Sequence, residues 1–441
     1  MSSENNNIGG NVSANNYIET DENISLKEKL GYGLGDTASN LVWQVLMIFQ
    51  LYFYTDIFGI SPAVAGTMFL ITKIWDSIND PIMGVVADRT NTKWGKFRPW
   101  ILWLALPFAF IGVITFTTPD LGMSSKIVYA YVTYTLMMMV YTAINIPYSS
   151  LMGVVSASPK QRASFSQFRF MLAFSGGLLV QGLTLPLVNA IGGDNTDVYS
   201  AELSGTEIVI TENGIGATKL VVEADMGEED LLTKNQTVIV YKSELKDEID
   251  TTTDILYLEE GFGTHTLNTS TYFDKEVSSE KLSVHVVNES KGFQGVMIVY
   301  GIMAIVMFLV TFYSTKERVA PPKEQKADTK KDFKDLVGNG PWLLLLAVGI
   351  VSLAYIAIRY GSIMYYFKYF IEDESLASPF LVSGTITTII AISFTEKLSD
   401  KFGKKKVFIT SHLIAGTFTA LFFYIDKSNI VTLFIFNIII S

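Results

Sequence analysis

Apolar segments long enough to cross a membrane recur along the chain, and they constrain its fold more than any other feature. A helix rises about 1.5 Å per residue, so about 20 apolar residues cross a hydrocarbon core of about 30 Å. Nine segments are expected at residues 28–57, 62–86, 99–118, 126–150, 165–190, 293–314, 341–369, 377–395 and 406–425. A tenth begins near Ile430 and reaches Ser441, about 12 residues or about 18 Å. The pattern predicts an all-α polytopic membrane protein whose sequence ends inside its tenth helix.

The composition agrees with a membrane protein and points away from covalent chemistry. Hydrophobic residues make up 49% of the chain and charged residues only 17%. The chain contains no cysteine, which excludes disulfides and thiolate metal sites. Its three histidines, His265, His285 and His412, form no spaced metal motif, and no nucleophile is patterned with a base. We therefore expect no enzyme activity, no catalytic residue and no cofactor.

Basic residues alternate along the chain with the spanning segments. Lysines and arginines follow every second segment, and Lys27 and Lys29 precede the first one. Cytoplasmic loops of membrane proteins carry an excess of these residues. The basic loops and the N-terminus are therefore predicted to face the cytoplasm, in a multi-pass protein of the cell membrane.

One long segment breaks this alternation. Residues 192–290 contain no spanning segment and carry 21 acidic residues against 6 lysines. The net charge of −10 therefore comes from this segment and indicates no particular partner. Runs rich in β-branched residues at 206–210 and 219–222, with Asn213–Gly214 between them, favour short strands and a hairpin. We expect a small β-rich extracellular insertion; a disordered acidic loop is the alternative.

Two aspartates, Asp76 and Asp80, lie within a spanning segment, in the stretch KIWDSINDPIMG. Their spacing of four residues places both carboxylates on one helical face. Each costs about 2.5–3.5 kcal/mol at mid-membrane, so something must compensate for the charge. A bound cation is the natural compensator. The alternative is a structural network with Lys73 or Arg98.

Two loops share a pattern of an acid and a basic residue ahead of a glycine. They read GVVADRTNTKWGKFRPW (84–100) and TEKLSDKFGKKKVF (395–408). In the first loop the residues are Asp88, Arg89, Gly95 and Lys96, and in the second Asp400, Lys401, Gly403 and Lys404. Each loop follows the second helix of a half, which indicates the parallel repeat of major facilitator transporters. We interpret the pattern as a cytoplasmic gate motif; positive-inside topology alone explains the lysines but not the repeated Asp and Gly.

Several stretches carry a resemblance to a known family. They are KLGYGLGDTASN (29–40), YFYTDIFGIS (52–61), KIWDSINDPIMG (73–84), RTNTKWGKFRPW (89–100) and VTYTLMMMVYTAINIPYSSL (132–151), and more loosely MYYFKYFI (364–371). The chain resembles the glycoside–pentoside–hexuronide:cation symporters, the family of the melibiose permease. The resemblance implies a major facilitator fold of six plus six helices. Two departures from the family pattern are expected: the last two helices are absent from the sequence, and the acidic insertion is additional.

The resemblance implies where the coupling cation binds. In the family, the acids of the second helix contribute the cation site and the fourth helix completes it. By match, the cation site consists of Asp76, Asp80, Thr142 and Asn145. Carboxylate and hydroxyl oxygens suit a hard monovalent cation, and either acid can instead hold a proton. Na⁺ and H⁺ therefore both remain open as the coupling ion, and no other metal is expected.

The resemblance also implies a sugar site. The melibiose permease grips its sugar with acids where this chain has Asn40 and Asn145, so melibiose-type specificity is not implied. Asp36, four residues before Asn40, is expected to replace some of the lost acidity; a pore-lining or gate residue is the alternative. Arg169 and Tyr141 match a sugar-contacting arginine and an aromatic of the same pocket. An ion pair and simple packing are their respective alternatives.

Arg359, in AYIAIRYGS, is an intramembrane cation on the seventh helix. Such residues are functional hypotheses by default. We expect Arg359 to bind a hexuronate carboxylate or to close a gate by pairing with an acid. A snorkelling arginine is the alternative.

These observations predict cation-coupled uptake of a glycoside, pentoside or hexuronide by alternating access. The expected partners are a small sugar, a monovalent cation and the lipid bilayer, with no nucleic acid, and the protein is expected to be a monomer. A membrane-anchored sugar sensor that uses the insertion, or a non-functional transporter fragment, are the alternatives. The expected parts are a disordered cytoplasmic tail (1–25), helices I–V (26–190), the insertion (191–291), helix VI (292–315), a cytoplasmic loop (316–340) and an incomplete second bundle (341–441).

Overall fold

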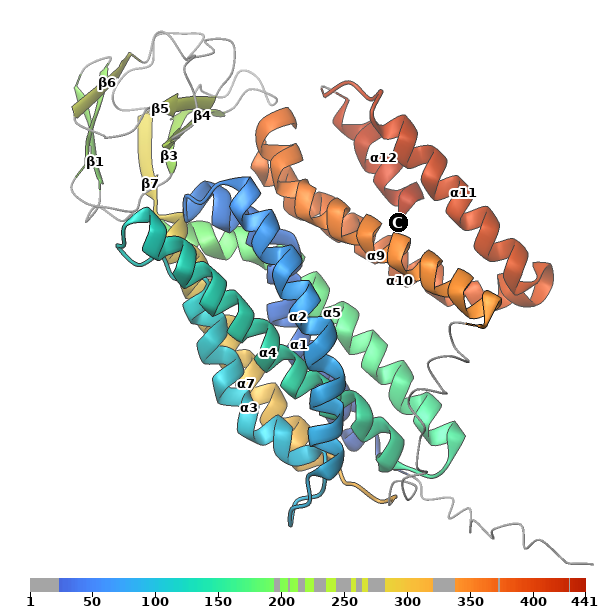
Figure 1. Cartoon of the computed structure of the whole chain (residues 1–441). Coiled ribbons are helices and arrows are strands. Elements are labelled where there is room, and N and C mark those ends of the chain that lie inside the picture. The colour runs from blue at the N-terminus through green and yellow to red at the C-terminus, as the bar shows by residue number, and fades with distance from the viewer. Residues whose placement is uncertain are drawn as a thin grey trace, which may run out of the picture.

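Six helices form an N-terminal bundle in the computed structural model (Figure 1). The structure describes residues 24–193, 288–319, 338–371, 373–427 and 429–441, together with seven strands between residues 199 and 287. The bundle consists of α1 (Leu26–Tyr52), α2 (Pro62–Arg89), α3 (Arg98–Thr115), α4 (Met123–Val155), α5 (Pro159–Gly192) and α7 (Glu289–Ser314). Helix α1 packs most extensively against α5 and α7, while α3 packs on α4 and α7 and α2 packs on α4.

Four further helices form the second half. They are α9 (Gly340–Tyr365), α10 (Ala377–Phe402), α11 (Lys404–Phe422) and α12 (Ile430–Ile440). Helix α9 contacts α1, α10 contacts α5, and α11 packs along α12. Figure 1 shows these four helices lying to one side of the N-terminal bundle. The two halves therefore meet through α1 and α5 on one side and α9 and α10 on the other.

Several helix ends differ from the predicted ones. The segment predicted at 28–57 stops being α-helical at Tyr52 and continues as a π-helical turn, η1 (Phe53–Ile57). Helix α9 likewise continues into a π-helical turn, η3 (Tyr366–Ile371), which is followed by a single 3₁₀ turn, η4 (Glu374–Leu376). Helix α7 begins at Glu289, before the predicted segment at 293–314, because the Asn288 side chain caps it by accepting from the Lys291 amide.

Six described stretches are long and apolar enough to span a membrane. They are Arg98–Thr115, Met123–Val155, Pro159–Gly192, Glu289–Ser314, Gly340–Ile371 and Glu374–Ile392. Helices α1 and α2 exceed the required length but are more polar. Asp36 lies on α1, and Asp76 and Asp80 lie on α2. Two helices that are too polar to be recognised as membrane spans therefore carry acidic candidate site residues.

Seven strands lie between α5 and α7. They are β1 (Tyr199–Ser204), β2 (Glu207–Glu212), β3 (Lys219–Asp225), β4 (Asn235–Lys242), β5 (Ile255–Leu258), β6 (Thr264–Asn268) and β7 (Leu282–Val287). One sheet has the order β1-β2-β6 and the other β5-β4-β3-β7, with only the β4–β5 pair parallel. The predicted hairpin between β2 and β3 is wrong, because these strands belong to different sheets. The strands lie at the end of the bundle opposite the α2–α3 loop (Figure 1), and we call this the strand-bearing end.

Helices α5 and α7 approach each other closely where the strands begin and end. The Asn288 amide donates to the Gly192 carbonyl over 2.6 Å. A β-carbon at Gly292 would lie only 2.5 Å from the carbonyl oxygen of Val188. The absence of a side chain at Gly292 therefore permits this backbone contact.

We expect Gly292→Ala to lower the free energy of unfolding by about 1–3 kcal/mol, because the added methyl group overpacks a backbone contact. Thermal unfolding of the detergent-solubilised protein measures this effect. The matched control is Gly349→Ala on α9, where a β-carbon has no neighbour within 4 Å. Equal thermal midpoints for the two variants would contradict the close α5–α7 contact.

Candidate functional site

A single threonine hydroxyl lies between the two aspartates of α2. Thr142 Oγ1, on α4, is 3.0 Å from Asp76 Oδ1 and 2.9 Å from Asp80 Oδ1. The two carboxylate oxygens therefore lie within about 6 Å of each other, close enough for strong mutual repulsion. One hydroxyl carries one proton, so it cannot fully satisfy both carboxylates at once. A cation or a proton among these three groups relieves the remaining repulsion.

Lys73 lies at the edge of this acid pair. Its Nζ is 3.3 Å from Asp76 Oδ2, and its side chain is 50% exposed, against 17% for Asp76. The same ammonium lies 5.2 Å from the centre of the Trp43 ring. The Lys73 alternative raised by the sequence is therefore present for Asp76. Because an exposed ion pair is weak, it leaves room for a mobile cation to compete.

Helix α4 connects this acid pair to a cluster of aromatic rings. Tyr141, adjacent to Thr142 in sequence, stacks on Trp43 of α1 with ring centres 4.6 Å apart. Asn145 donates its amide to the Tyr141 carbonyl over 3.1 Å. In this structure the Asn145 amide nitrogen therefore bonds its own helix, and its place in the cation site stays a prediction.

Asp36 and Arg169 form an ion pair between α1 and α5. Arg169 Nε is 3.0 Å from Asp36 Oδ2, with side chains 24% and 11% exposed. The guanidinium also lies 5.2 Å from the centre of the Tyr148 ring. Asn40 donates its amide to the Asp36 carbonyl over 2.9 Å, and its side chain is half-buried. The structure thus brings together the acid, the arginine and the amide that the sequence singled out separately.

Arg359 lies apart from this cluster, in the second half. Its Nη2 donates to Asn437 Oδ1 over 2.6 Å and to Ser441 Oγ over 3.1 Å. Asn437 in turn donates its amide to the Phe380 carbonyl over 2.7 Å. Within the described part of the chain Arg359 bonds two neutral side chains, Asn437 on α12 and Ser441 just after it, and no acid pairs with it there.

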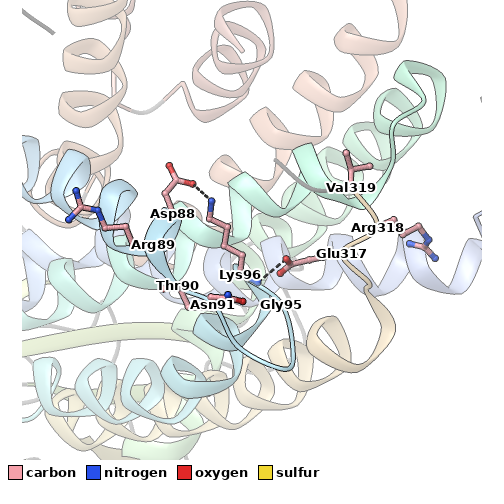
Figure 2. A pocket seen from close by; sticks show the side chains of 9 residues that line it. All are labelled: Asp88, Arg89, Thr90, Asn91, Gly95, Lys96, Glu317, Arg318 and Val319. Atoms are coloured by element: carbon pink, nitrogen blue, oxygen red, sulfur yellow. Dashed lines mark hydrogen bonds and ion pairs between the residues drawn. The ribbon is translucent and has the colours of Figure 1, made fainter. Parts of the chain in front are cut away.

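The first gate motif surrounds a hollow of about 470 Å³ (Figure 2). Asp88 pairs with Lys96 of its own loop over 3.1 Å, and the Asp88 side chain is 59% exposed. Gly95 adopts a positive φ of 110°. Arg89 is exposed and lines the same hollow.

Glu317, just past the end of α7, binds the start of α3. Its carboxylate accepts hydrogen bonds from three successive amides, those of Lys96 (2.8 Å), Phe97 (2.8 Å) and Arg98 (3.0 Å). A β-carbon at Gly95 would lie 2.5 Å from this carboxylate, which explains the glycine of the motif. A carboxylate at a helix N-terminus satisfies amides that have no partner within the helix.

The next residue, Arg318, extends this attachment to α1. Its guanidinium binds Glu28 through two nitrogens, at 2.6 and 2.8 Å. The sequence interpretation missed Glu317 and the Glu28–Arg318 pair. The available signal was an acid between two basic residues, KER at 316–318, immediately after a spanning segment.

The second gate motif resembles the first mainly in its backbone. Gly403 has a positive φ of 85°, as Gly95 does, and it separates α10 from α11. Asp400 and Lys401 are exposed. The side chain of Lys404 lies outside the described residues, so the comparison of the two motifs extends only to Gly403.

The comparisons with known proteins agree on one family. A family model described as MFS/sugar transport protein matches residues 31–211 and 273–441. The unmatched residues between these two parts, 212–272, fall within the predicted insertion. The chain therefore belongs to the MFS/sugar transport protein family, and within it to the glycoside–pentoside–hexuronide:cation symporters. Members of this family are membrane transporters and not enzymes.

Individual relatives match over nearly the whole chain. The inner membrane symporter YicJ of Escherichia coli is 31% identical over 421 residues, covering 95% of this chain and 71% of YicJ. The putative glycoside/cation symporter YagG of the same organism is 30% identical, covering 94% of this chain and 70% of YagG. The isoprimeverose transporter of Lactiplantibacillus pentosus is 26% identical, covering 89% of this chain and 63% of that protein.

We expect Glu317→Gln to destabilise the protein by about 1.5–3 kcal/mol, because charge-assisted bonds to three amides are weakened. Asp88→Asn is the matched control. It removes one exposed ion pair and should cost at most about 1 kcal/mol. Thermal unfolding of both variants in detergent tests the difference. A larger loss for Asp88→Asn than for Glu317→Gln would show that the motif acid, and not Glu317, holds the loop.

Proposed function

We propose that the protein couples uptake of a glycoside, pentoside or hexuronide to Na⁺ or H⁺ by alternating access. The observation that carries this proposal is the shared hydroxyl of Thr142 between Asp76 and Asp80. Buried ion pairs to both acids would leave no role for a further cation, but Lys73 reaches only Asp76 and is half exposed. Two carboxylates around one hydroxyl retain excess negative charge, which favours binding of a cation or a proton.

The proposed sugar site lies beside the acid pair. Asp36, Asn40 and Arg169 offer an acceptor, an amide and a cation to sugar hydroxyls, and Tyr141 contributes an aromatic face. In the same proposal Asn145 and Arg359 line the sugar path, although their present hydrogen bonds are to other groups. A hexuronate carboxylate would pair with Arg169 or Arg359.

Coupling between the two sites passes through one turn of α4. Thr142 contacts the acids, while its neighbour Tyr141 stacks on Trp43. A cation that draws Thr142 and the acids together therefore also sets the position of the Tyr141 ring. Since binding free energies are reciprocally linked, sugar that orders Tyr141 raises the affinity for the cation in return.

The proposal also covers the orientation in the membrane, the two gate loops and the oligomeric state. The basic α2–α3 loop lies at the opposite end from the strands (Figure 1), which supports a cytoplasmic N-terminus and an extracellular insertion in the cell membrane. The two glycine-centred loops would serve as cytoplasmic gates between the halves. In this proposal the protein acts as a monomer, with both sites within one chain.

We expect Asp76→Asn and Asp80→Asn to abolish cation-driven sugar accumulation in proteoliposomes. Each variant replaces one of the two carboxylates by a neutral amide and so removes half of the negative charge that offsets dehydration of a cation, whereas sugar hydroxyls can use other partners. Sugar exchange down a gradient should therefore survive. The measurement compares accumulation under an imposed Na⁺ or H⁺ gradient with exchange at equilibrium.

The matched control for the acid pair is Ser77→Ala. Ser77 is an exposed neighbour on α2 whose hydroxyl only bonds the Lys73 carbonyl. Its removal should leave both activities near wild type. Full concentrative uptake by either aspartate variant, with either ion, would rule out the coupling role of the pair.

We propose that the strand-bearing insertion is not needed for the transport cycle. Its ends meet at the Gly192–Asn288 hydrogen bond, so a short linker can replace the residues between them. Asn288 itself must be kept, because its side chain caps α7 by accepting from the Lys291 amide over 2.9 Å.

We expect deletion of residues 194–287, with a short glycine-serine linker, to leave sugar uptake intact. The insertion is strongly acidic and can concentrate cations near the protein by an amount that falls as salt rises. The expected cost is therefore a modest, salt-sensitive loss of apparent cation affinity, measured by uptake at two ionic strengths. Loss of sugar binding by the folded deletion variant would instead favour a sensor whose ligand site includes the insertion.

A further inference from the structure

Two oppositely charged side chains that the proposed sites do not use lie where the halves of the protein meet. Asp56 belongs to η1, which continues α1, and Lys368 belongs to η3, which continues α9. Lys368 Nζ is 2.9 Å from Asp56 Oδ1, and the side chains are only 4% and 7% exposed. The pair joins residues 312 positions apart in the sequence. It is therefore a buried electrostatic link between the two halves.

The two charged turns occupy corresponding places in the internal repeat. Helices α1 and α9 each begin a half, and each continues without a break into a π-helical turn. π-helical turns are rare in proteins and are found frequently at functional sites. The turn of the first half carries an acid, and the turn of the second half carries a base. The repeat thus places opposite charges on facing turns.

Further polar and aromatic groups surround Asp56 and Lys368. The hydroxyl of Tyr369 also donates to Asp56, and Thr55 Oγ1 donates to Asp56 Oδ2 over 2.6 Å. Lys368 Nζ lies 4.9 Å from the centre of the Tyr52 ring. A buried charge that loses its partner is strongly unfavourable, whereas the intact pair is tolerated. The intact pair therefore holds the two halves together at this point. If the pair breaks, the halves must separate far enough for water to hydrate both charges.

Tyr52, which lies beside Lys368, makes further contacts with two acidic residues. The Tyr52 hydroxyl donates to Glu289, at the start of α7, over 3.1 Å and to Glu374 of η4 over 3.3 Å. On the other contact between the halves, Thr385 Oγ1 of α10 donates to Gln181 Oε1 of α5 over 2.6 Å. Glu289 follows β7 by a single intervening residue, so the Tyr52–Glu289–Glu374 contacts lie toward the strand-bearing end.

We propose that Asp56 and Lys368 are gating residues that close the strand-bearing end of the transport path. The structure shows that gate closed. At the other end of the second half, Lys401, Phe402 and Gly403 are exposed. Each transport cycle must break and re-form the Asp56–Lys368 pair, so its strength sets the balance between the two access states. This assignment goes beyond the proposed coupling mechanism and can be tested without any sugar.

Site-directed labelling reports the state of the gate. The chain contains no cysteine, so one introduced thiol is a unique target. Met47→Cys is a suitable reporter, because Met47 is half-buried on α1 between Asn40 and the gate. Its position seven residues after Asn40 places both on one helical face. A membrane-impermeant maleimide, added to the strand-bearing side of vesicles of known sidedness, measures access through the gate.

We expect Asp56→Asn and Lys368→Gln each to raise the labelling rate about tenfold, because either change destabilises the closed state relative to the open one. Lys368→Arg keeps the charge and should label at the wild-type rate. The double variant Asp56→Asn with Lys368→Gln should label no faster than the faster single variant, because two partners of one interaction do not act additively. Asp120→Asn, an exposed acid in the α3–α4 loop, is the matched control and should change nothing.

Two results would overturn the assignment. One is wild-type labelling in both single variants that elute as folded protein from a sizing column. The other is strictly additive acceleration in the double variant, which would mean that the two residues act separately. If a single variant fails to fold, the comparison of the double variant with Lys368→Arg still decides the question, because neither leaves an unpaired charge.

A cross-link provides an independent test in the otherwise unaltered protein. Thr55 Oγ1 of η1 and the hydroxyl of Tyr365, the last residue of α9, share a hydrogen bond of 2.6 Å. A cleavable bismaleimide joining Thr55→Cys and Tyr365→Cys should stop sugar uptake, and cleavage should restore it. Uptake that continues while the cross-link is intact would exclude opening at this point. Absence of uptake before cross-linking would instead count against the proposed transport function and leave the labelling result unaffected.

Discussion

Burial of carboxylates in a medium of low polarity is the constraint on which the structure depends. Such a group is strongly unfavourable unless a donor or a cation accompanies it. In the described parts of the chain the donors come from distant segments: Arg318 for Glu28, Arg169 for Asp36, and Lys368 for Asp56. These pairs fasten α1 to the end of α7, to α5 and to the second half. Helix α1 is therefore the element around which the protein is held together.

The acid pair on α2 differs from Glu28, Asp36 and Asp56 in the groups that offset its negative charge. Asp36 and Asp56 each face a cationic side chain, whereas Asp76 and Asp80 share one neutral hydroxyl. The half-exposed Lys73 reaches only Asp76. Of these acids, Asp76 and Asp80 have the less complete compensation, so an incoming cation gains more beside them. That contrast within a single chain supports the coupling proposal more strongly than the presence of two acids alone.

Much of the site was accessible from the sequence because an ion-binding helix has to break the apolar pattern. Asp76, Asp80 and Thr142 were predicted together, and they lie together. The hydrogen-bond partners of Asn145 and Arg359 could not be predicted, because an amide or a guanidinium bonds whichever acceptor its helix packing presents. Glu317 was missed because its partners are backbone amides, which have no sequence signature.

The sequence by itself determined the membrane-spanning pattern, the acid pair and the family, since hydropathy, charge and short motifs are properties of neighbouring residues. The repeated loops also singled out Gly95 and Gly403 as matching positions, and both adopt a positive φ in the structure. The tertiary structure alone decided which charges meet. Asp56 and Lys368 are 312 residues apart, and their pairing depends on how two repeated bundles dock. Contacts across that distance arise from packing of whole helices, which no local pattern encodes.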